Sequence, residues 1–312
     1  MRKMINRTFI SGPVYQHSLE IKVSGPESKN PGTEFITGTL EVATDDAGVN
    51  IVPVHFTYTT ATYGKSGKPN DTFNTLKNFI TGAYKTIMKD GAENATKVRI
   101  DSAIGLNEFY TDRSGKEELV SAKRNEGGFV HVVSTLDDDE KKRNTFEVDM
   151  IITGVTHLDG DPEKNTSDKA IVKGAIFDFR NSLLPVEFSA TNPRAMDYFE
   201  NLGASTKSPV FTKLKGVQLS ETIVRQIVEE SAFGEPSVRE VKNTRKDFVI
   251  TWASETPYDW DSEDTITAAE LREAMAARET ALATMKQRND AYKASKGQSP
   301  AAPAPATGGF NF

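Results

Sequence analysis

The chain contains no cysteine. This excludes disulfides, thiolate zinc sites, iron–sulfur clusters and cysteine nucleophiles. No segment approaches the ~20 consecutive apolar residues of a membrane-spanning helix, and no apolar segment follows the basic N-terminus. We therefore expect a cytoplasmic protein that carries no secretory signal.

Residues that commonly carry catalysis are also scarce. There is no G-x-S-x-G motif and no dinucleotide glycine fingerprint. Asp159-Gly160-Asp161 lacks the later glutamate of a calcium loop, and the acidic run 137–140 is typical of a solvated linker because basic residues follow it. The histidines are scattered and form no pair at i,i+4 spacing: His17, His55, His131 and His157. We expect no enzyme, no cofactor and no metal.

Acidic charge is in excess, but it is unevenly distributed. The net charge is −6 overall, +1 for residues 1–135, −5 for residues 136–255 and −2 for residues 256–312. A nucleic-acid-binding domain is more often basic. An anionic partner should therefore prefer the first part of the chain.

The end of the chain has a composition of its own. Residues 298–312 are uncharged and rich in Pro, Ala and Gly, which predicts a flexible, disordered tail with an apolar tip at Phe310 and Phe312. A helix is predicted from Thr267 to about Lys293, opened by a capping box of Thr267 and Glu270. Arg278 and Asn289 interrupt its apolar stripe, which would pack against the domain or against a partner helix. The stripe consists of Leu271, Met275, Leu282, Met285 and Tyr292.

The remainder consists mostly of short β-prone runs separated by Gly, Pro, Asn and Asp. Expected strands are Phe35–Val42, Ile51–Thr60, Lys97–Ala103, Phe129–Val133, Phe146–Val155 and Phe248–Ala253. Helices are expected at Thr72–Lys89, Arg194–Leu202 and Ser220–Glu230. The chain is therefore predicted to be mainly β with a few helices.

Five short matches recur in the same order in the two halves of the chain. Each half has a glycine-containing start, a second glycine, a Pro-Val-x-Phe run, an amphipathic segment and a closing β run. The pairs are Ile10–Gly12 with Ile152–Gly154, Gly38–Leu40 with Gly174–Ile176, Val52–Phe56 with Leu184–Phe188, Phe73–Phe79 with Met196–Leu202, and Phe129–Val132 with Phe248–Thr251. The shared order favours duplication of one unit. The alternative is chance similarity between two β-rich halves.

The repeated unit has about five strands with a helix between the third and the fourth, which is the layout of an OB-fold. We expect tandem OB-fold-like five-stranded barrels followed by a helix and the tail. The predicted parts are an OB-fold domain at 1–135, a charged linker at 136–144, a second domain at 145–255, an acidic segment with a helix at 256–297, and the tail at 298–312.

The first half combines an Asn-containing first strand with a glycine at Met4–Gly12, aromatic hairpin segments at His55–Tyr58 and Tyr63–Lys65, and the stretch Asn107–Lys116. In these features it resembles single-stranded DNA-binding proteins of bacteria and their phages, and the second half resembles them weakly. The resemblance implies an OB-fold that binds single strands. Two fused units suit a phage-type protein. Members of the family often recruit partners through an acidic, phenylalanine-ended tail, whereas the tail of this chain ends in phenylalanine without an acid.

Binding single strands without sequence preference requires cations that follow the phosphates and aromatic faces that stack the bases. Gly64–Lys68 would form a basic hairpin tip that could approach a phosphate chain. For each aromatic residue the alternative is core packing, which is favoured for Phe56 and Phe129 because they alternate with Val. Besides Phe129, the candidates in the first half are His55, Phe56, Tyr58, Tyr63, Lys65, Lys68, Lys97, Arg99, Phe109, Tyr110, Arg113, Lys116, Lys123 and Arg124.

The second half offers a weaker or mainly structural counterpart because acids are in excess there. Its candidate cations are Lys213, Lys215, Lys242, Arg245 and Lys246, with Phe177, Phe179, Phe188 and Trp252 among its aromatics. Tyr258 and Trp260 lie among acids, which repel phosphate. We interpret these two residues as clamps that hold the C-terminal helix.

Together these features predict a protein that binds single-stranded DNA without sequence preference and protects it during phage replication or recombination. It would act as a monomer or small homo-oligomer in the host cytoplasm and contact replication or recombination proteins through Phe310 and Phe312. Two alternatives remain open: a β-rich virion or assembly protein, and a single-strand annealing protein.

Overall fold

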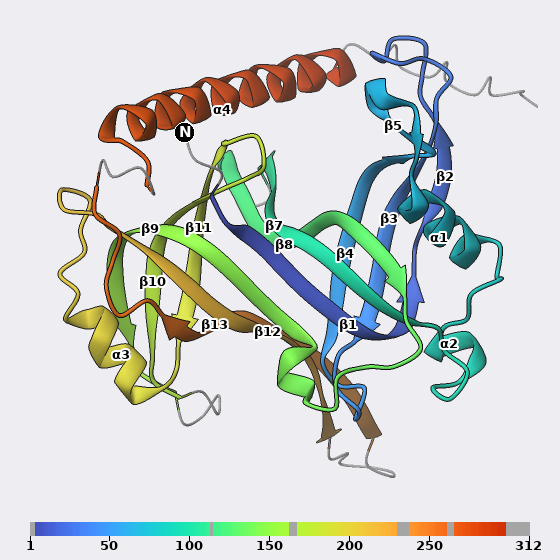
Figure 1. The fold of residues 1–312 in the computed structure, drawn as a ribbon, viewed down its shortest axis with the longest axis horizontal. Coiled ribbons are helices and arrows are strands. Elements are labelled where there is room, and N and C mark those ends of the chain that lie inside the picture. The colour runs from blue at the N-terminus through green and yellow to red at the C-terminus, as the bar shows by residue number, and fades with distance from the viewer. Residues whose placement is uncertain (1–3, 113–114, 162–166, 230–236, 261–264, 298–312) are drawn as a thin grey trace, which may run out of the picture.

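The structure is a computed structural model that describes residues 4–112, 115–161, 167–229, 237–260 and 265–297, with only the backbone described for Lys65, 221–245 and 296–297. Eleven strands form one continuous sheet that is closed on itself twice (Figure 1). Two β-barrels therefore share a single sheet. Among the described residues, no helix is long and apolar enough to span a membrane.

The first barrel contains five strands and a helix between the third and the fourth. Around the barrel the strands follow the order β1-β3-β4-β8-β7, and β7 closes onto β1. All contacts are antiparallel except that between β4 and β8, the third and fifth strands of the barrel. This is the OB-fold arrangement. The elements are β1 (Asn6–His17), β3 (Glu34–Ala43), β4 (Ile51–Thr60), α1 (Asp71–Ile80), β7 (Lys97–Thr111) and β8 (Glu118–Val132), with the short additions β2 (Glu20–Val23), β5 (Thr62–Tyr63), β6 (Lys68–Pro69) and α2 (Ile87–Asp90).

The second barrel repeats this arrangement. Its strands follow the order β9-β10-β11-β13-β12, and β12 closes onto β9. The contact between its third and fifth strands is again parallel. The expected tandem of OB-fold barrels is therefore confirmed. The elements are β9 (Asn144–Leu158), β10 (Lys169–Phe177), β11 (Leu183–Ala190), α3 (Pro193–Glu200), β12 (Val210–Glu229) and β13 (Ser237–Ala253).

Alternating apolar residues fill the interior of each barrel. Along β4, Val52, Val54 and Phe56 are buried in the first core, and α1 covers it with Phe73, Leu76 and Phe79 at helical spacing. Asn70 caps α1 by accepting a hydrogen bond from the Thr72 N–H at 3.2 Å. The second core is built around a cluster of three rings, Phe146, Phe188 and Phe248.

The two barrels are joined where β1 pairs antiparallel with β9. These are the equivalent first strands of the two units. Antiparallel pairing of equivalent strands relates the barrels by an approximate twofold axis. In the repeat alignment Asn6 corresponds to Val148, and these two residues face each other in the pairing.

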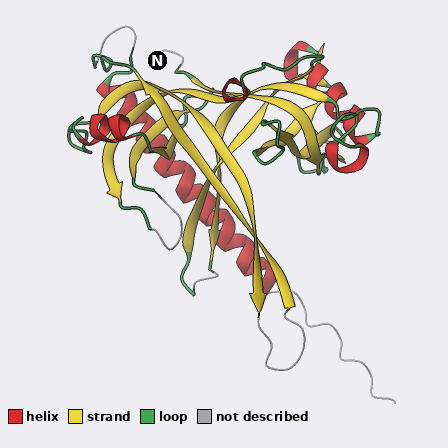
Figure 2. Cartoon of the chain, turned by 90° about the horizontal axis from the view of Figure 1, so that it is seen from below, coloured by secondary structure: helices red, strands yellow, loops and turns green. Residues whose placement is uncertain are grey.

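Each barrel extends its last hairpin onto the other barrel. The β7–β8 hairpin of the first barrel inserts Ile104 and Leu106 into the core cluster of the second. The β12–β13 hairpin reaches back to the first barrel, where Gln218 accepts a hydrogen bond at 2.8 Å from Asn125 on β8 and the Ser220 N–H donates to Asn50 at 2.6 Å. Beyond these contacts it projects away from both barrels as a two-stranded arm (Figure 2).

The segment after β13 packs on the outside of the second barrel. Tyr258 and Trp260 lie against Phe211, in a cluster that also contains Leu271 and Ala274 from the C-terminal helix α4 (Ala268–Gly297). The two aromatics clamp the start of this helix, as predicted. The expected capping box is also present, because the Glu270 N–H donates to Thr267 and the Thr267 N–H donates to Glu270.

Polar contacts hold the rest of α4 across the end of the β7–β8 hairpin (Figure 1). Arg278 pairs with Glu108 at 2.6 Å, and Lys286 and Lys293 pair with Glu117 at 3.1 and 3.0 Å. Asn289 donates to the same carboxylate. The expectation of an apolar stripe was therefore only partly correct. Arg278 and Asn289, which seemed to interrupt the stripe, make contacts, whereas Met275 and Tyr292 are exposed.

Two predicted helices differ from the structure. Residues 220–229 belong to strand β12, because a run of Thr, Ile and Val favours a strand and β13 supplies a partner along its length. The helix expected at 72–89 ends at Ile80 and a separate short turn follows. Gly82, with φ +80°, takes the left-handed conformation that terminates helices. The helix expected at 194–202 is confirmed as α3.

Candidate nucleic-acid interface

The strongest candidate site lies on the outside of β3 and β4 in the first barrel. In OB-folds this face binds oligonucleotides and oligosaccharides. We call it the β3–β4 face and define it by Phe35, Thr39, His55 and Tyr58, with Arg124 and Lys246 beside them.

Tyr58 is the exposed aromatic of this face. Its side chain is 47% exposed, and its ring lies 4.5 Å from that of Phe35, centre to centre. Its hydroxyl lies 3.2 Å from the Ser24 hydroxyl, in the loop after β2. These contacts fix the ring in position while leaving part of it accessible to a base.

A β-bulge explains why Tyr58 points outward whereas Phe56 points inward. Ile36 pairs with Thr59 and Gly38 pairs with Phe56, so two residues of β4 oppose one residue of β3. A bulge of this kind re-aims the side chains that follow it. Phe56, proposed from the sequence as a binding residue, is 2% exposed and belongs to the core. Core packing, the alternative that the sequence favoured for Phe56, is therefore confirmed, and Phe56 is not a binding residue.

His55 lies among the charged groups of the face. Its Nδ1 lies 2.9 Å from the Thr39 hydroxyl. Burial lowers the pKa of His55, and the positive charges of Arg124 and Lys246 lower it further, against the opposing effect of Glu126 and Glu41. Two cations and two carboxylates therefore lie close enough to this ring to act on it, and the cations are the groups that could contact a phosphate.

These cations come from two different barrels. Arg124 lies on β8 of the first barrel, where its Nε donates to Glu126 at 2.6 Å. Lys246 lies on β13 of the second barrel and is exposed. The structure thus brings part of the basic run 242–246 to the first barrel. The side chains of Lys242 and Arg245 in that run lie outside the described residues.

The short β5–β6 hairpin directly follows β4. Tyr63 and Lys68 pair across it and are both exposed. Between them Lys65 lies in a 3₁₀ turn whose backbone alone is described. The hairpin predicted at Gly64–Lys68 is therefore present. It follows β4, one of the two strands of the β3–β4 face, directly in the sequence.

The tip of the β7–β8 hairpin carries four further candidates. Phe109 and Lys116 are exposed and Tyr110 is partly buried, while Arg113 lies outside the described residues. The carboxylate of Glu117 beside them is bound by Lys286 and Lys293 of α4. This tip is therefore also the contact surface of the C-terminal helix.

Lys123 is partly buried against the second barrel. Its ammonium lies 5.0 Å from the centre of the Phe188 ring and 5.1 Å from that of Phe248, and it donates to the Glu187 carbonyl. Burial lowers its pKa to about 8. The assignment of Lys123 to a DNA-binding surface was wrong because the hairpin carries it into the second barrel.

Four predicted cations lie away from the β3–β4 face, on the outer sides of β7 and β12. These residues are Lys97, Arg99, Lys213 and Lys215. Phe129 was expected in the core, but it is 54% exposed on β8. The tail residues Phe310 and Phe312 lie outside the described residues.

The described part of the chain contains no cluster of three or more His, Asp or Glu side chains that could hold a metal ion. His157 is engaged by Glu200 at 2.6 Å and Asp159 at 3.4 Å on the surface of the second barrel. The hydrogen bond to Glu200 raises the pKa of His157.

Comparison with known proteins places the sequence in a family. The family model YorF matches residues 5–288. The chain belongs to the YorF family. No curated protein matches this YorF-family chain.

Among solved structures, the chain is similar to a deletion mutant of the single-stranded DNA binding protein from Thermus aquaticus. The two are 10% identical and align with a TM-score of 0.46, over 85% of this chain and 100% of that one. The strand order of its two barrels establishes the architecture of this YorF-family chain.

Proposed function

We propose that this chain binds single-stranded DNA without sequence preference, through the β3–β4 face of its first barrel. The observation that carries the proposal is the joint presentation of an exposed, fixed aromatic ring, Tyr58, and two cations, Arg124 and Lys246, on the face that OB-folds use for ligands. Stacking on Tyr58 and phosphate contacts to the cations are the two elements that such binding requires.

In this proposal the protein performs no chemistry and needs no cofactor. It shields single strands during DNA replication or recombination, in the cytoplasm of the host if a phage encodes it. The tail that ends in Phe310 and Phe312 would recruit replication or recombination proteins. The sequence resemblance to phage-type single-stranded DNA-binding proteins supports these roles.

Substitutions on the face test the proposal. Tyr58→Ala should weaken binding of an oligo-dT strand ~5- to 150-fold, the loss expected for one stacked base. Lys246→Gln should weaken binding and reduce the slope of log affinity against log salt by about 0.7, the value for one phosphate contact on a single strand. Fluorescence anisotropy of a labelled oligonucleotide measures both effects.

Matched controls lie on the second barrel. Phe179→Ala removes an exposed aromatic from the turn between β10 and β11, and Lys207→Gln removes an exposed cation from the loop before β12. Both should leave affinity unchanged. Equal losses in the controls and the face variants, or no loss in either, would refute the assignment of the face.

A further inference from the structure

The outer side of the junction between the barrels carries rows of side chains that the β3–β4 face does not include. Arg7 on β1 pairs with Glu147 on β9, Glu147 pairs with Lys215 on β12, and Lys215 pairs with Trp252 on β13. Residues paired across adjacent strands project from the same side of a sheet. These four residues therefore form one continuous row across two barrels.

A second row lies one step along the strands. Phe9 on β1 pairs with Asp101 on β7, and Asp101 pairs with Phe129 on β8. We call the two rows together the junction face. Between them is a hollow of about 270 Å³, lined in part by Arg7, Phe9 and Glu147.

The ends of the junction face are exposed aromatic rings. Trp252 is 47% exposed and Phe129 is 54% exposed. Five strand-to-strand steps separate β13 from β8 in the sheet order, a distance of about 24 Å at the usual strand spacing. The face is therefore long enough to contact several nucleotides of an extended strand.

The charge between the rings is positive. Burial alone would raise the pKa of Glu147, but a hydrogen bond from Arg7 and the charges of Arg7, Lys215 and Lys213 outweigh it and lower that pKa. Three cations thus surround one carboxylate. The other acid of the face, Asp101, lies 3.5 Å from Arg99.

Three cations share one carboxylate on this face. The Arg7 side chain is 72% exposed while it contacts Glu147 at 2.5 Å, and the Glu147 side chain is only 14% exposed. Lys215 and Lys213 each lie 3.8 Å from Glu147, and Lys215 lies 5.1 Å from the centre of the Trp252 ring. One of these cations can therefore contact a phosphate while the others remain paired with Glu147.

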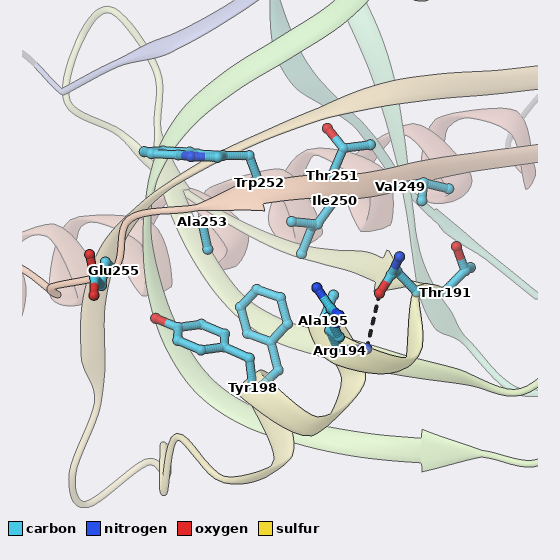
Figure 3. Close-up of a pocket in the computed structure, with 12 residues that line it drawn as sticks. Thr191, Arg194, Ala195, Tyr198, Val249, Ile250, Thr251, Trp252, Ala253 and Glu255 are labelled. Carbon is cyan, nitrogen blue, oxygen red and sulfur yellow. Dashed lines mark hydrogen bonds between the residues drawn. The ribbon is translucent and has the colours of Figure 1, made fainter.

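Trp252 also forms one side of a pocket of about 480 Å³ in the second barrel (Figure 3). Ile250 and Ala253 of β13 lie beside it, and Tyr198 and Ala195 of α3 lie on the opposite side. The hydroxyl of Tyr198 is already used, because it donates to the Ser254 carbonyl at 3.1 Å. This pocket, lined by Tyr198 and Phe199 together with Arg194 and Glu255, offers space for a base next to the exposed indole.

We propose that the junction face is a second contact surface for single-stranded nucleic acid, with bases stacking on Trp252 and Phe129 and phosphates contacting Arg7, Lys213 and Lys215. This inference rests on the proposed function, because it assigns a further part of the same strand to a surface formed by both barrels. It gives the second barrel a direct part in binding despite its acidic composition.

Tryptophan fluorescence isolates this surface. The chain has only two tryptophans, and Trp260 packs on Phe211, in the cluster that holds the start of α4. In a Trp260→Phe background, an oligo-dT of about 30 nucleotides should quench the fluorescence of Trp252. The midpoint of this quenching should equal the midpoint of binding measured by the anisotropy of the labelled strand. The double substitution Arg7→Gln with Lys215→Gln should weaken binding of that strand at least tenfold and lower the salt slope. Lys207→Gln serves as the matched control.

The possible failures are distinguishable. If the strand binds and Tyr58→Ala weakens it, yet Trp252 fluorescence and the Arg7/Lys215 variant are unaffected, the junction face is not a binding surface and the β3–β4 face acts alone. If no single strand binds under any condition, both proposals fail. If an acidic peptide binds at Trp252 and the strand does not, the face is a protein-docking surface and the inference is wrong.

Discussion

At the scale of single residues, Lys123 shows how context changes the role of a side chain. The sequence presents it, next to Arg124, as one of the cations interleaved with aromatic residues in the first half. In the structure it lies between two phenylalanine rings of the other barrel, and its pKa is lowered to about 8. At neutral pH the folded protein still carries this charge. Compared with a lysine of ordinary pKa, the charged Lys123 lowers the free energy of unfolding by about 3 kcal/mol.

This shift predicts a specific dependence of stability on pH. Between pH 8 and 10.5 the unfolded chain keeps the Lys123 proton and the folded chain releases it, so this group's contribution to stability rises with pH through that window. Below pH 8 the cost is fully present. Urea unfolding at pH 7.5 and 10 should show the wild type gaining about 2 kcal/mol relative to Lys123→Met. A difference between the two proteins that stays constant with pH would show that Lys123 does not titrate there.

Two bulges decide which aromatic residues of β4 and β8 face the core and which face outward. Simple alternation would put Phe56 and Tyr58 on the same side of β4. Because of the bulge between them, Phe56 faces the core and Tyr58 faces outward. In the same way, Phe129 follows a bulge in β8 at Gly127 and Gly128. A Cβ on Gly128 would lie 2.1 Å from the Asp101 carbonyl oxygen. Periodicity assumes an unbroken strand, so it could identify these residues as candidates without settling which way they point.

At the scale of elements, each barrel closes through a close approach of backbone to glycine. A Cβ on Gly12 of β1 would lie 1.8 Å from the carbonyl oxygen of Ala43 on β3, and a Cβ on Gly174 of β10 would lie 2.0 Å from that of Ile151 on β9. Closure of a small barrel forces its strands together at such points. Glycines at these two positions therefore permit the close strand contacts of a closed barrel.

The repeat supplies a matched pair for testing this closure. Gly12 corresponds to Gly154 in the second half, where a Cβ would meet no atom within 4 Å. Gly12→Ala should destabilise the fold by about 2–3 kcal/mol, as overpacking does, whereas Gly154→Ala should change stability by less than about 0.5 kcal/mol. Urea midpoints compare the two variants. Similar midpoints would show that the closing contact at Gly12 relaxes without cost.

The helices show where sequence patterns are sufficient and where they are not. α1 and α3 each begin at an asparagine cap and follow helical spacing, and both were predicted. The stretch 220–229 has comparable amphipathic spacing, but it becomes a strand because β13 pairs along it. Such pairing is decided by residues distant in sequence, which local propensity does not include.

At the scale of the whole molecule, the barrels are interlocked rather than merely linked. Each extends its last hairpin onto the other, and Gln218, Asn125 and Asn50 join them through hydrogen bonds. The repeat and the OB-fold could be predicted from five short matches in order. The exchange of hairpins could not, because it depends on how far β7–β8 and β12–β13 extend beyond their own barrels. This exchange brings Lys246 to the β3–β4 face and carries Lys123 away from solvent.

The central claim is that this composite surface binds single strands through stacking and phosphate contacts. The most direct measurement is a titration of the purified protein with labelled oligo-dT and with a matched duplex, at low and moderate salt. The account predicts tight binding to the single strand alone, which weakens as salt rises because phosphate contacts release counterions. Failure to bind the single strand at low salt, or affinity that does not change with salt, would contradict it and favour a structural role for the duplicated barrels.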